Sequence, residues 1–242
     1  MNNSAIIVVD MLNDFAHPTG LLYVKNSEKI IEPIKNILDA ARIVGAQVIY
    51  ACDWHDENDP EFENWPKHCV KNTWGANIVD ELMPKRRVGG NGFIANDQSV
   101  PDLVIHKNQL SAMTSFHFRT WLNEWTYLSR ATKNRDKQHQ YIYVVGVATE
   151  YCVKSLVVDL HSQMNPLRVH VVSDCIEGVD LKKGDVTEAI VDISRYAHFI
   201  RSNELISRQA DISDIGVHQL IQKNIDIDIP KSIYRGPVEM DD

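Results

Sequence analysis

A short loop at residues 53–68 carries two imidazoles and several carboxylates, directly after an apolar run at residues 47–52 that is typical of a strand. Asp53 and His55 stand in an Asp-x-His pattern, and Glu61 and His68 follow in the same loop. Histidine nitrogens and carboxylate oxygens are ligands that zinc, manganese and iron accept in proteins. The pattern indicates either a site for one divalent metal ion or a polar surface loop that holds two of the ten histidines.

A second group of polar residues stands where predicted strands end. Asp10 follows the first strand-like run, Asp53 the second and Lys107 the third, and the turn at residues 146–152 follows the fourth. Because the carboxyl ends of parallel strands share one edge of a sheet, we expect these groups to lie together. The alternative is that Asp10 and Lys107 only pair with each other or face solvent.

Cys152 is the nucleophile candidate in this group. It stands at the start of a predicted helix, where the helix dipole and free N–H groups favour a thiolate. Lys107 would lower the pKa of the thiol further, and Asp10 would accept its proton and pass it to a leaving amine. The backbone N–H groups from Ala148 to Cys152 could hold an oxyanion. Taken alone, Cys152 could also be a buried structural thiol.

The elements that must position these residues alternate between strand and helix. Strands are expected at residues 5–9, 47–52, 103–105, 141–145, 168–172 and 199–200, and helices at residues 30–44, 115–128, 150–164 and 186–196. Continuous apolar runs rich in β-branched residues are typical of strands buried on both faces. The pattern predicts an α/β fold with a doubly wound, mostly parallel sheet of about six strands and helices on both faces, in three layers.

Polar segments interrupt this alternation. We expect a surface excursion at residues 84–98 and a solvated loop at residues 130–140. From residue 203 onward the alternation stops, although residues 212–221 could form one helix. We therefore predict one domain over residues 1–202 and a C-terminal extension, residues 203–242, that packs on this domain or trails from it.

Composition narrows the class of protein. A chain of 242 residues can bury the core of one sizeable domain. A formal net charge of −8 argues against a nucleic acid or an anionic membrane as partner. No apolar run reaches the length of a membrane span, and the N-terminus lacks the basic region of a signal peptide. The four cysteines have no paired spacing, so we expect reduced thiols and a cytoplasmic location.

The motifs together resemble those of the isochorismatase-like superfamily of cysteine hydrolases, and within it those of the nicotinamidases. The segments that carry the resemblance are VVDMLNDF at residues 8–15, DWH at 53–55, WPKHCV at 65–70, VIHK at 104–107 and GVATEYCV at 146–153. The metal loop and the turn that bears Cys152 are the specific signals. Two positions depart from the nicotinamidase pattern, since Leu12 replaces a common Gln and Asn72 a common Gly.

The resemblance implies a role for each residue. It implies catalysis by Asp10, Lys107 and Cys152, an oxyanion site at the amides of Ala148 and Cys152, and a cis peptide bond before Ala148. It also implies substrate stacking on Phe15, which Trp65 would complete as a sandwich. The implied metal ligands are Asp53, His55 and His68, with Glu61 in the place of a further histidine.

The function that follows is metal-dependent hydrolysis of nicotinamide to nicotinate and ammonia through a thioester. One divalent metal ion is expected. Zinc is the expected ion, and manganese and iron are the alternatives. Two other functions stay open: a related hydrolase of a carbamoyl or ureido amide, and a catalytically silent binding protein. The expected partner is a small-molecule amide, and the chain could form a homo-oligomer.

Overall fold

The computed structural model describes residues 3–85, 102–131, 140–163 and 167–210, and every statement below concerns these residues. Most of the predicted excursion at 84–98, most of the predicted loop at 130–140 and all of the possible helix at 212–221 lie outside them. None of the helices in these ranges is long and apolar enough to cross a membrane.

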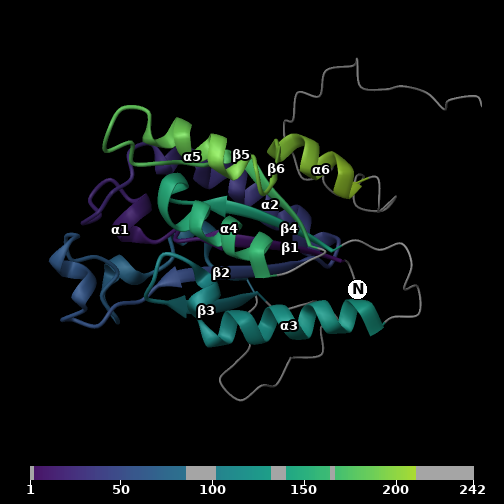
Figure 1. Cartoon of the computed structure of the whole chain (residues 1–242), viewed down its shortest axis with the longest axis horizontal. Helices are drawn as coiled ribbons and strands as arrows, with labels where there is room; N and C mark the ends of the chain where they lie inside the picture. The colour runs from purple at the N-terminus through teal and green to yellow at the C-terminus, as the bar shows by residue number, and fades with distance from the viewer. Residues whose placement is uncertain (1–2, 86–101, 132–139, 164–166, 211–242) are drawn as a thin grey trace, which may run out of the picture.

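The core of the molecule is a parallel sheet of six strands in the order β3-β2-β1-β4-β5-β6 (Figure 1). The strands are β1 (Ser4–Val9), β2 (Gln47–Asp53), β3 (Leu103–Lys107), β4 (Tyr141–Gly146), β5 (Arg168–Ile176) and β6 (His198–Ile200). The chain runs from β1 outward through β2 to β3, and then from β4 outward through β5 to β6. This is the doubly wound sheet that the sequence predicts.

Helices cover both faces of the sheet. One face packs against α2 (Ile31–Ile43) and α6 (Ser202–Ala210), and the other against α3 (Phe116–Ala131), α4 (Lys154–Gln163) and α5 (Asp185–Ile193). The short helix α1 (Asn13–Ala16) follows β1, and 3-10 turns lie at Ser27–Ile30, Pro60–Glu63, Trp74–Ala76, Asp80–Leu82 and Ala112–Thr114. A π-helical turn, Thr149–Val153, precedes α4. The three predicted layers are confirmed.

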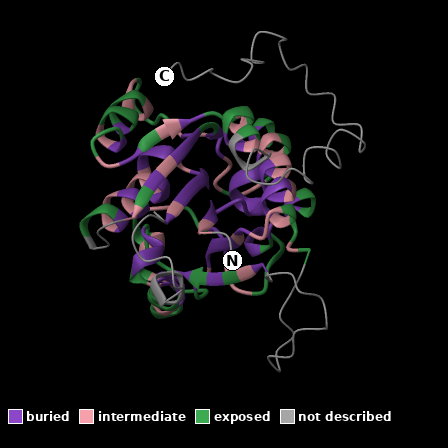
Figure 2. Cartoon of the chain, turned by 90° about the vertical axis from the view of Figure 1, so that its right-hand side faces the viewer, coloured by how far each residue is buried: buried purple, intermediate pink, exposed green. Residues whose placement is uncertain are grey.

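The residues of β1 explain why both faces are covered. Successive side chains of a strand point to opposite faces of the sheet. Ile6 and Val8 lie in the core cluster on the side of α2, whereas Ile7 and Val9 lie in the cluster on the side of α3 and α4. All four are buried, and Figure 2 shows the buried residues concentrated along the sheet and the inner sides of the helices.

Two elements extend beyond the sequence prediction. Strand β5 continues to Ile176, and α6 begins where the alternating pattern was expected to end. The Asp174 carboxylate at the end of β5 accepts hydrogen bonds from the Ser202 N–H (2.8 Å) and hydroxyl (2.6 Å), which fixes the start of α6. Leu205 then anchors α6 in the core. The predicted domain boundary after residue 202 falls within the first turn of α6, and this boundary stays a prediction.

Candidate active site

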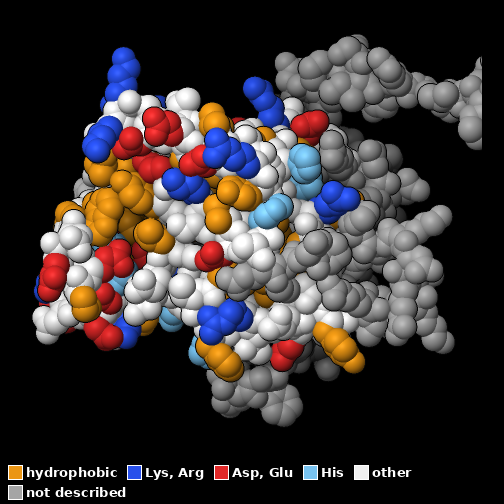
Figure 3. Space-filling view, viewed as in Figure 1, with side chains coloured by type: hydrophobic (Ala, Val, Ile, Leu, Met, Phe, Trp, Pro, Cys, Tyr) orange, Lys and Arg blue, Asp and Glu red, His pale blue; other side chains and the backbone are white. Residues whose placement is uncertain are grey.

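The order of the strands places a pocket between β1 and β4, where the direction of winding reverses. In doubly wound sheets this switch point, at the carboxyl ends of the strands, is where ligands bind. The pocket encloses about 440 Å³ of empty space, its open mouth included. Hydrophobic side chains gather on the surface at this end of the molecule (Figure 3). The lining residues are Asp10, Phe15, Leu22, Val24, Asp53, Glu61, Trp65, His68, Leu110, Ala148, Tyr151, Cys152 and Val179.

The turn that carries Cys152 begins where β4 ends. Gly146 has a φ of +113°, and a Cβ atom there would lie 2.0 Å from the carbonyl oxygen of Val9. Glycine is therefore required for β4 to end this close to β1. The Val147–Ala148 peptide bond is cis, as the resemblance implies. The π-helical turn then directs Cys152, which is 7% exposed, into the pocket.

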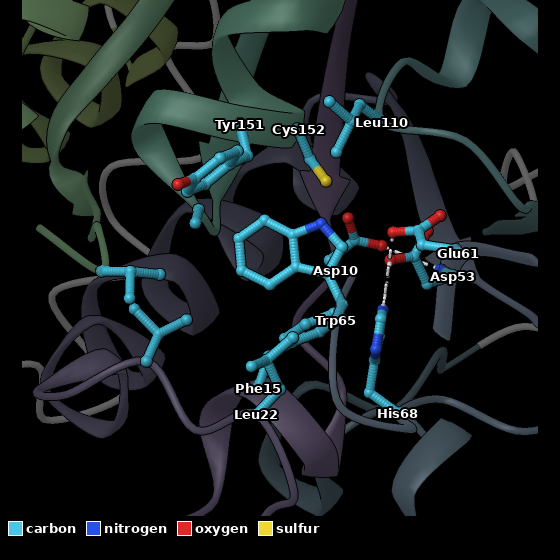
Figure 4. A pocket seen from close by; sticks show the side chains of 13 residues that line it. Asp10, Phe15, Leu22, Asp53, Glu61, Trp65, His68, Leu110, Tyr151 and Cys152 are labelled. Carbon is cyan, nitrogen blue, oxygen red and sulfur yellow. Dashed lines mark hydrogen bonds and ion pairs between the residues drawn. The ribbon is translucent and has the colours of Figure 1, made fainter. Parts of the chain in front are cut away.

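Lys107 lies at the centre of the group that the sequence predicts for catalysis. Its Nζ lies 2.8 Å from Oδ2 of Asp10, 2.5 Å from Oδ1 of Asp53 and 3.6 Å from Sγ of Cys152, and all four residues are buried. Asp10 has a φ of +50°, and its Oδ1 accepts the Asp53 N–H at 2.8 Å. The structure thus brings together the three residues predicted for catalysis, and Figure 4 shows the Asp10 carboxylate and the Cys152 sulfur in the same pocket.

The protonation states follow from burial and from these neighbours. Burial and then the charge of Asp53 raise the pKa of Asp10 to about 7, although Lys107 opposes the shift. Burial also raises the pKa of the Cys152 thiol, and Lys107 opposes this shift too. The sequence predicted a thiol with a lowered pKa; the effect of Lys107 is correct, but burial outweighs it. Cys152 is therefore a thiol beside a carboxyl group whose pKa lies near neutral pH.

Three predicted metal ligands converge beside this group. Oδ2 of Asp53 lies 3.7 Å from Nε2 of His55 and 3.9 Å from Nε2 of His68. The ligand atoms of the three residues all lie within 4.8 Å of one another. Glu61 stands at the edge of the group, with its Oε1 3.9 Å from Nε2 of His68. Figure 4 shows His68, Asp53 and Glu61 directed toward one point.

The other nitrogen of each imidazole is already engaged. Nδ1 of His55 lies 3.1 Å from the Asp59 carboxylate, and Nδ1 of His68 lies 2.7 Å from the carbonyl oxygen of Pro66. Both acceptors take a proton from Nδ1, which leaves Nε2 of each ring as the nitrogen that faces Asp53 and could bind a metal ion. Nε2 of His55 is buried without a hydrogen-bond partner among the described residues. A divalent metal ion fits this donor set.

Aromatic and aliphatic side chains form the rest of the pocket. Phe15 and Trp65 both line it, as predicted; the Phe15 ring lies 5.3 Å from that of His68, and the Trp65 ring meets Tyr151 edge-on at 5.2 Å. The sequence did not single out Tyr151, Asp59 or the aliphatic wall. Tyr151 is adjacent to Cys152, and this proximity was the available signal. The aliphatic wall is formed by separate loops that are distant in the sequence. No local sequence pattern shows that these loops meet.

All four cysteines are free and buried. Cys52 and Cys175 lie in strands β2 and β5, and burial raises the pKa of each thiol. Cys69 follows His68 directly but belongs to the core, and burial raises its thiol pKa as well. Among the four, only Cys152 lines the pocket.

Comparison with known proteins agrees with this geometry. The isochorismatase domain model matches residues 4–204. The nicotinamidase of Saccharomyces cerevisiae is 29% identical, and the match covers 62% of this chain and 77% of that protein. The nicotinamidase of Escherichia coli is 25% identical, and the match covers 78% of this chain and 90% of that protein.

The fold is also similar to that of a solved structure. The pyrazinamidase of Pyrococcus horikoshii, solved in complex with zinc, superposes with a TM-score of 0.62 and is 26% identical, covering 83% of this chain and 99% of that one. The family match includes the predicted metal-binding loop at residues 53–68 and the turn at residues 146–152 that bears Cys152. The chain therefore belongs to the isochorismatase family, as a nicotinamidase-like hydrolase that acts on amide bonds.

Proposed function

We propose that the protein hydrolyses nicotinamide to nicotinate and ammonia, with Cys152 as the nucleophile and a divalent metal ion, zinc first, held by Asp53, His55, His68 and Glu61. The observation that carries the proposal is the position of the two imidazole Nε2 atoms, those of His55 and His68. They face Asp53, which also contacts the Lys107 ammonium beside the thiol. When bound, the ion would accept the pyridine nitrogen and so orient the ring.

The reaction begins with transfer of the Cys152 proton to Asp10 as the sulfur attacks the carboxamide carbon. The amides of Ala148 and Cys152 hold the resulting oxyanion. The C–N bond then breaks, and Asp10 returns the proton to the departing nitrogen, which leaves as ammonia. Water attacks the thioester and gives a proton to Asp10; nicotinate leaves, and the sulfur recovers its proton.

Each residue suits its role in this scheme. Because the pKa of Asp10 is raised to about 7, its carboxyl can both take and return a proton near neutral pH. The Lys107 ammonium stabilises the developing thiolate at 3.6 Å. Phe15 and Trp65 supply apolar ring faces within the pocket, against which a flat heteroaromatic ring would pack.

The test compares two substrates that differ in one atom. Ammonia release is measured with nicotinamide and with benzamide, on zinc-loaded protein and on protein stripped with a chelator. We expect zinc-loaded protein to favour nicotinamide strongly, because benzamide lacks the ring nitrogen. Equal rates on both amides, or full activity without metal, would contradict the proposal. Activity confined to a ureido or carbamoyl substrate would identify the protein as the related hydrolase. The absence of activity on any amide would favour the catalytically silent binding protein.

A cytoplasmic location is proposed with this function. The four free cysteines are consistent with a reducing compartment. A homo-oligomer also stays a prediction, and its test is light scattering of the purified chain.

A further inference from the structure

Asp14 is a buried carboxylate that the proposed mechanism does not use. It lies in α1, directly before Phe15, and is 3% exposed. It forms no ion pair with a Lys, Arg or His of the described residues. Two backbone N–H groups from different segments stabilise it instead. A buried carboxylate is retained at such a position only when its hydrogen bonds are made.

One oxygen of Asp14 holds the metal loop. Oδ2 accepts the Cys69 N–H at 2.7 Å, and the Cys69 carbonyl accepts the His55 N–H at 3.0 Å. Cys69 also follows His68 directly, so its peptide units touch both imidazole ligands. Its φ of +46° is unusual for a residue other than glycine and costs roughly 1–2 kcal/mol. The bond from Asp14 offsets part of this cost and holds the backbone between His55 and His68.

The other oxygen holds the opposite wall of the pocket. Oδ1 accepts the Leu21 N–H at 3.0 Å, and the backbone carbonyl of Asp14 accepts the Leu22 N–H at 3.0 Å. Leu22 lines the pocket together with Phe15. The Asp14 side chain therefore bridges the metal loop and the backbone of Leu21, the residue directly before Leu22 of the pocket wall.

Gly75 packs directly against the Asp14 carboxylate. A Cβ atom on Gly75 would lie 2.0 Å from Oδ2 of Asp14, so a larger residue there would have to displace the carboxylate. The same contact offers a second way to displace the carboxylate without changing Asp14 itself.

We propose that Asp14 is a positioning residue that couples the metal site to the Leu21–Leu22 segment, in which Leu22 lines the pocket. The proposal rests on the proposed function, because it requires the cluster of Asp53, His55 and His68 to bind a metal ion. Outer partners of metal ligands typically alter metal affinity by about 10- to 100-fold when they are removed. Asp14 lies one step further out, so we expect the lower end of this range, about tenfold.

The first experiment measures zinc affinity by competition with a chelator for the wild type, Asp14→Asn and Gly75→Ala. Asp56→Asn is the matched control, since Asp56 is an exposed carboxylate of the same loop, paired with Lys71 at 2.7 Å. We expect about tenfold weaker zinc binding in Asp14→Asn and a loss of the same direction in Gly75→Ala, with the control unchanged. Wild-type affinity in a folded Asp14→Asn would overturn the proposal, whereas a wild type that binds no zinc would instead refute the metal site.

The second experiment needs no variant and covers the case in which the substitutions prevent folding. Hydrogen exchange of the wild-type chain is followed with and without zinc. If Asp14 couples the two segments, zinc should slow exchange in the peptide that contains Leu21 and Leu22 as well as in the metal loop. Protection confined to the metal loop would overturn the coupling. A merely structural role for Asp14 predicts protection in the Leu21–Leu22 segment that does not change with zinc.

Discussion

Replacement of Lys107 by methionine tests the electrostatic design of the site most directly. The substitution keeps an apolar stem of similar length but removes the cation that lies between Asp10, Asp53 and Cys152. Burial already raises the pKa of Asp10 to about 7 while Lys107 lowers it. Without the cation this pKa must rise further, and the pKa of the Cys152 thiol must rise with it. The higher thiol pKa opposes transfer of the proton to Asp10, and the higher Asp10 pKa leaves fewer Asp10 carboxylates ionised to receive it at neutral pH.

The magnitude follows from the ionised fraction of Asp10. With a pKa of about 7, half of the Asp10 carboxyls are ionised at pH 7; the first unit of increase lowers that fraction about fivefold, and each later unit lowers it about tenfold. A positioned general base contributes about 10²–10⁴-fold to the rate. We therefore expect kcat/KM at pH 7 to fall on the order of 10²–10⁴-fold. Because only ionised Asp10 accepts the proton, wild-type activity is lost as the pH falls through about 7, and in Lys107→Met this loss should begin at higher pH.

The assay is ammonia release as a function of pH with saturating zinc. Lys154→Met serves as the control: Lys154 lies in α4 just after the nucleophile turn, and its Nζ is 4.0 Å from the Asp192 carboxylate at the surface. Such exposed pairs contribute little, so this variant should match the wild type. Removal of one partner from a buried ion pair costs about 3–5 kcal/mol, so thermal unfolding must show that Lys107→Met is folded. Folded Lys107→Met with wild-type kcat/KM and an unshifted pH profile would refute the reasoning.

Three further predictions follow from the same geometry. Cys152→Ala should abolish turnover while zinc content stays at the wild-type level, and iodoacetamide should label Cys152 before Cys69 because only Cys152 lines the pocket; mass spectrometry with peptide mapping decides this, and first labelling of Cys69 with activity retained would contradict it. His68→Ala should lower both zinc occupancy and nicotinamide hydrolysis, and Glu61→Ala should do so less because water can replace an edge carboxylate; metal analysis that ranks Glu61→Ala as the more damaging change would reverse these assignments. Trp65→Ala should raise KM for nicotinamide more than it lowers kcat, since the ring would support binding without taking part in proton transfer; steady-state kinetics test this, and a loss confined to kcat would exclude a binding role.

Local pattern was sufficient for the strands and for the chemistry at their ends. The apolar runs that lead into Asp10, Asp53 and Lys107 predicted buried parallel strands, and a parallel sheet brings their carboxyl ends to one edge. The three catalytic candidates could therefore be placed together from sequence, because topology alone makes them neighbours. The helix α6 could not, since its position depends on the contact of Ser202 with Asp174 and on the burial of Leu205.

The sequence by itself determined the fold class, the edge at which the polar residues meet and the residue types that can bind a metal ion or attack an amide. Tertiary structure decided what those residues can do. Burial made Cys152 a thiol rather than a thiolate, because desolvation outweighed the nearby cation. The acceptors at Asp59 and Pro66 fixed which imidazole nitrogens face Asp53, and Asp14 joined two segments that are distant in the chain. These effects depend on the exclusion of water and on the direction of hydrogen bonds. Both arise only when separate loops pack against one another.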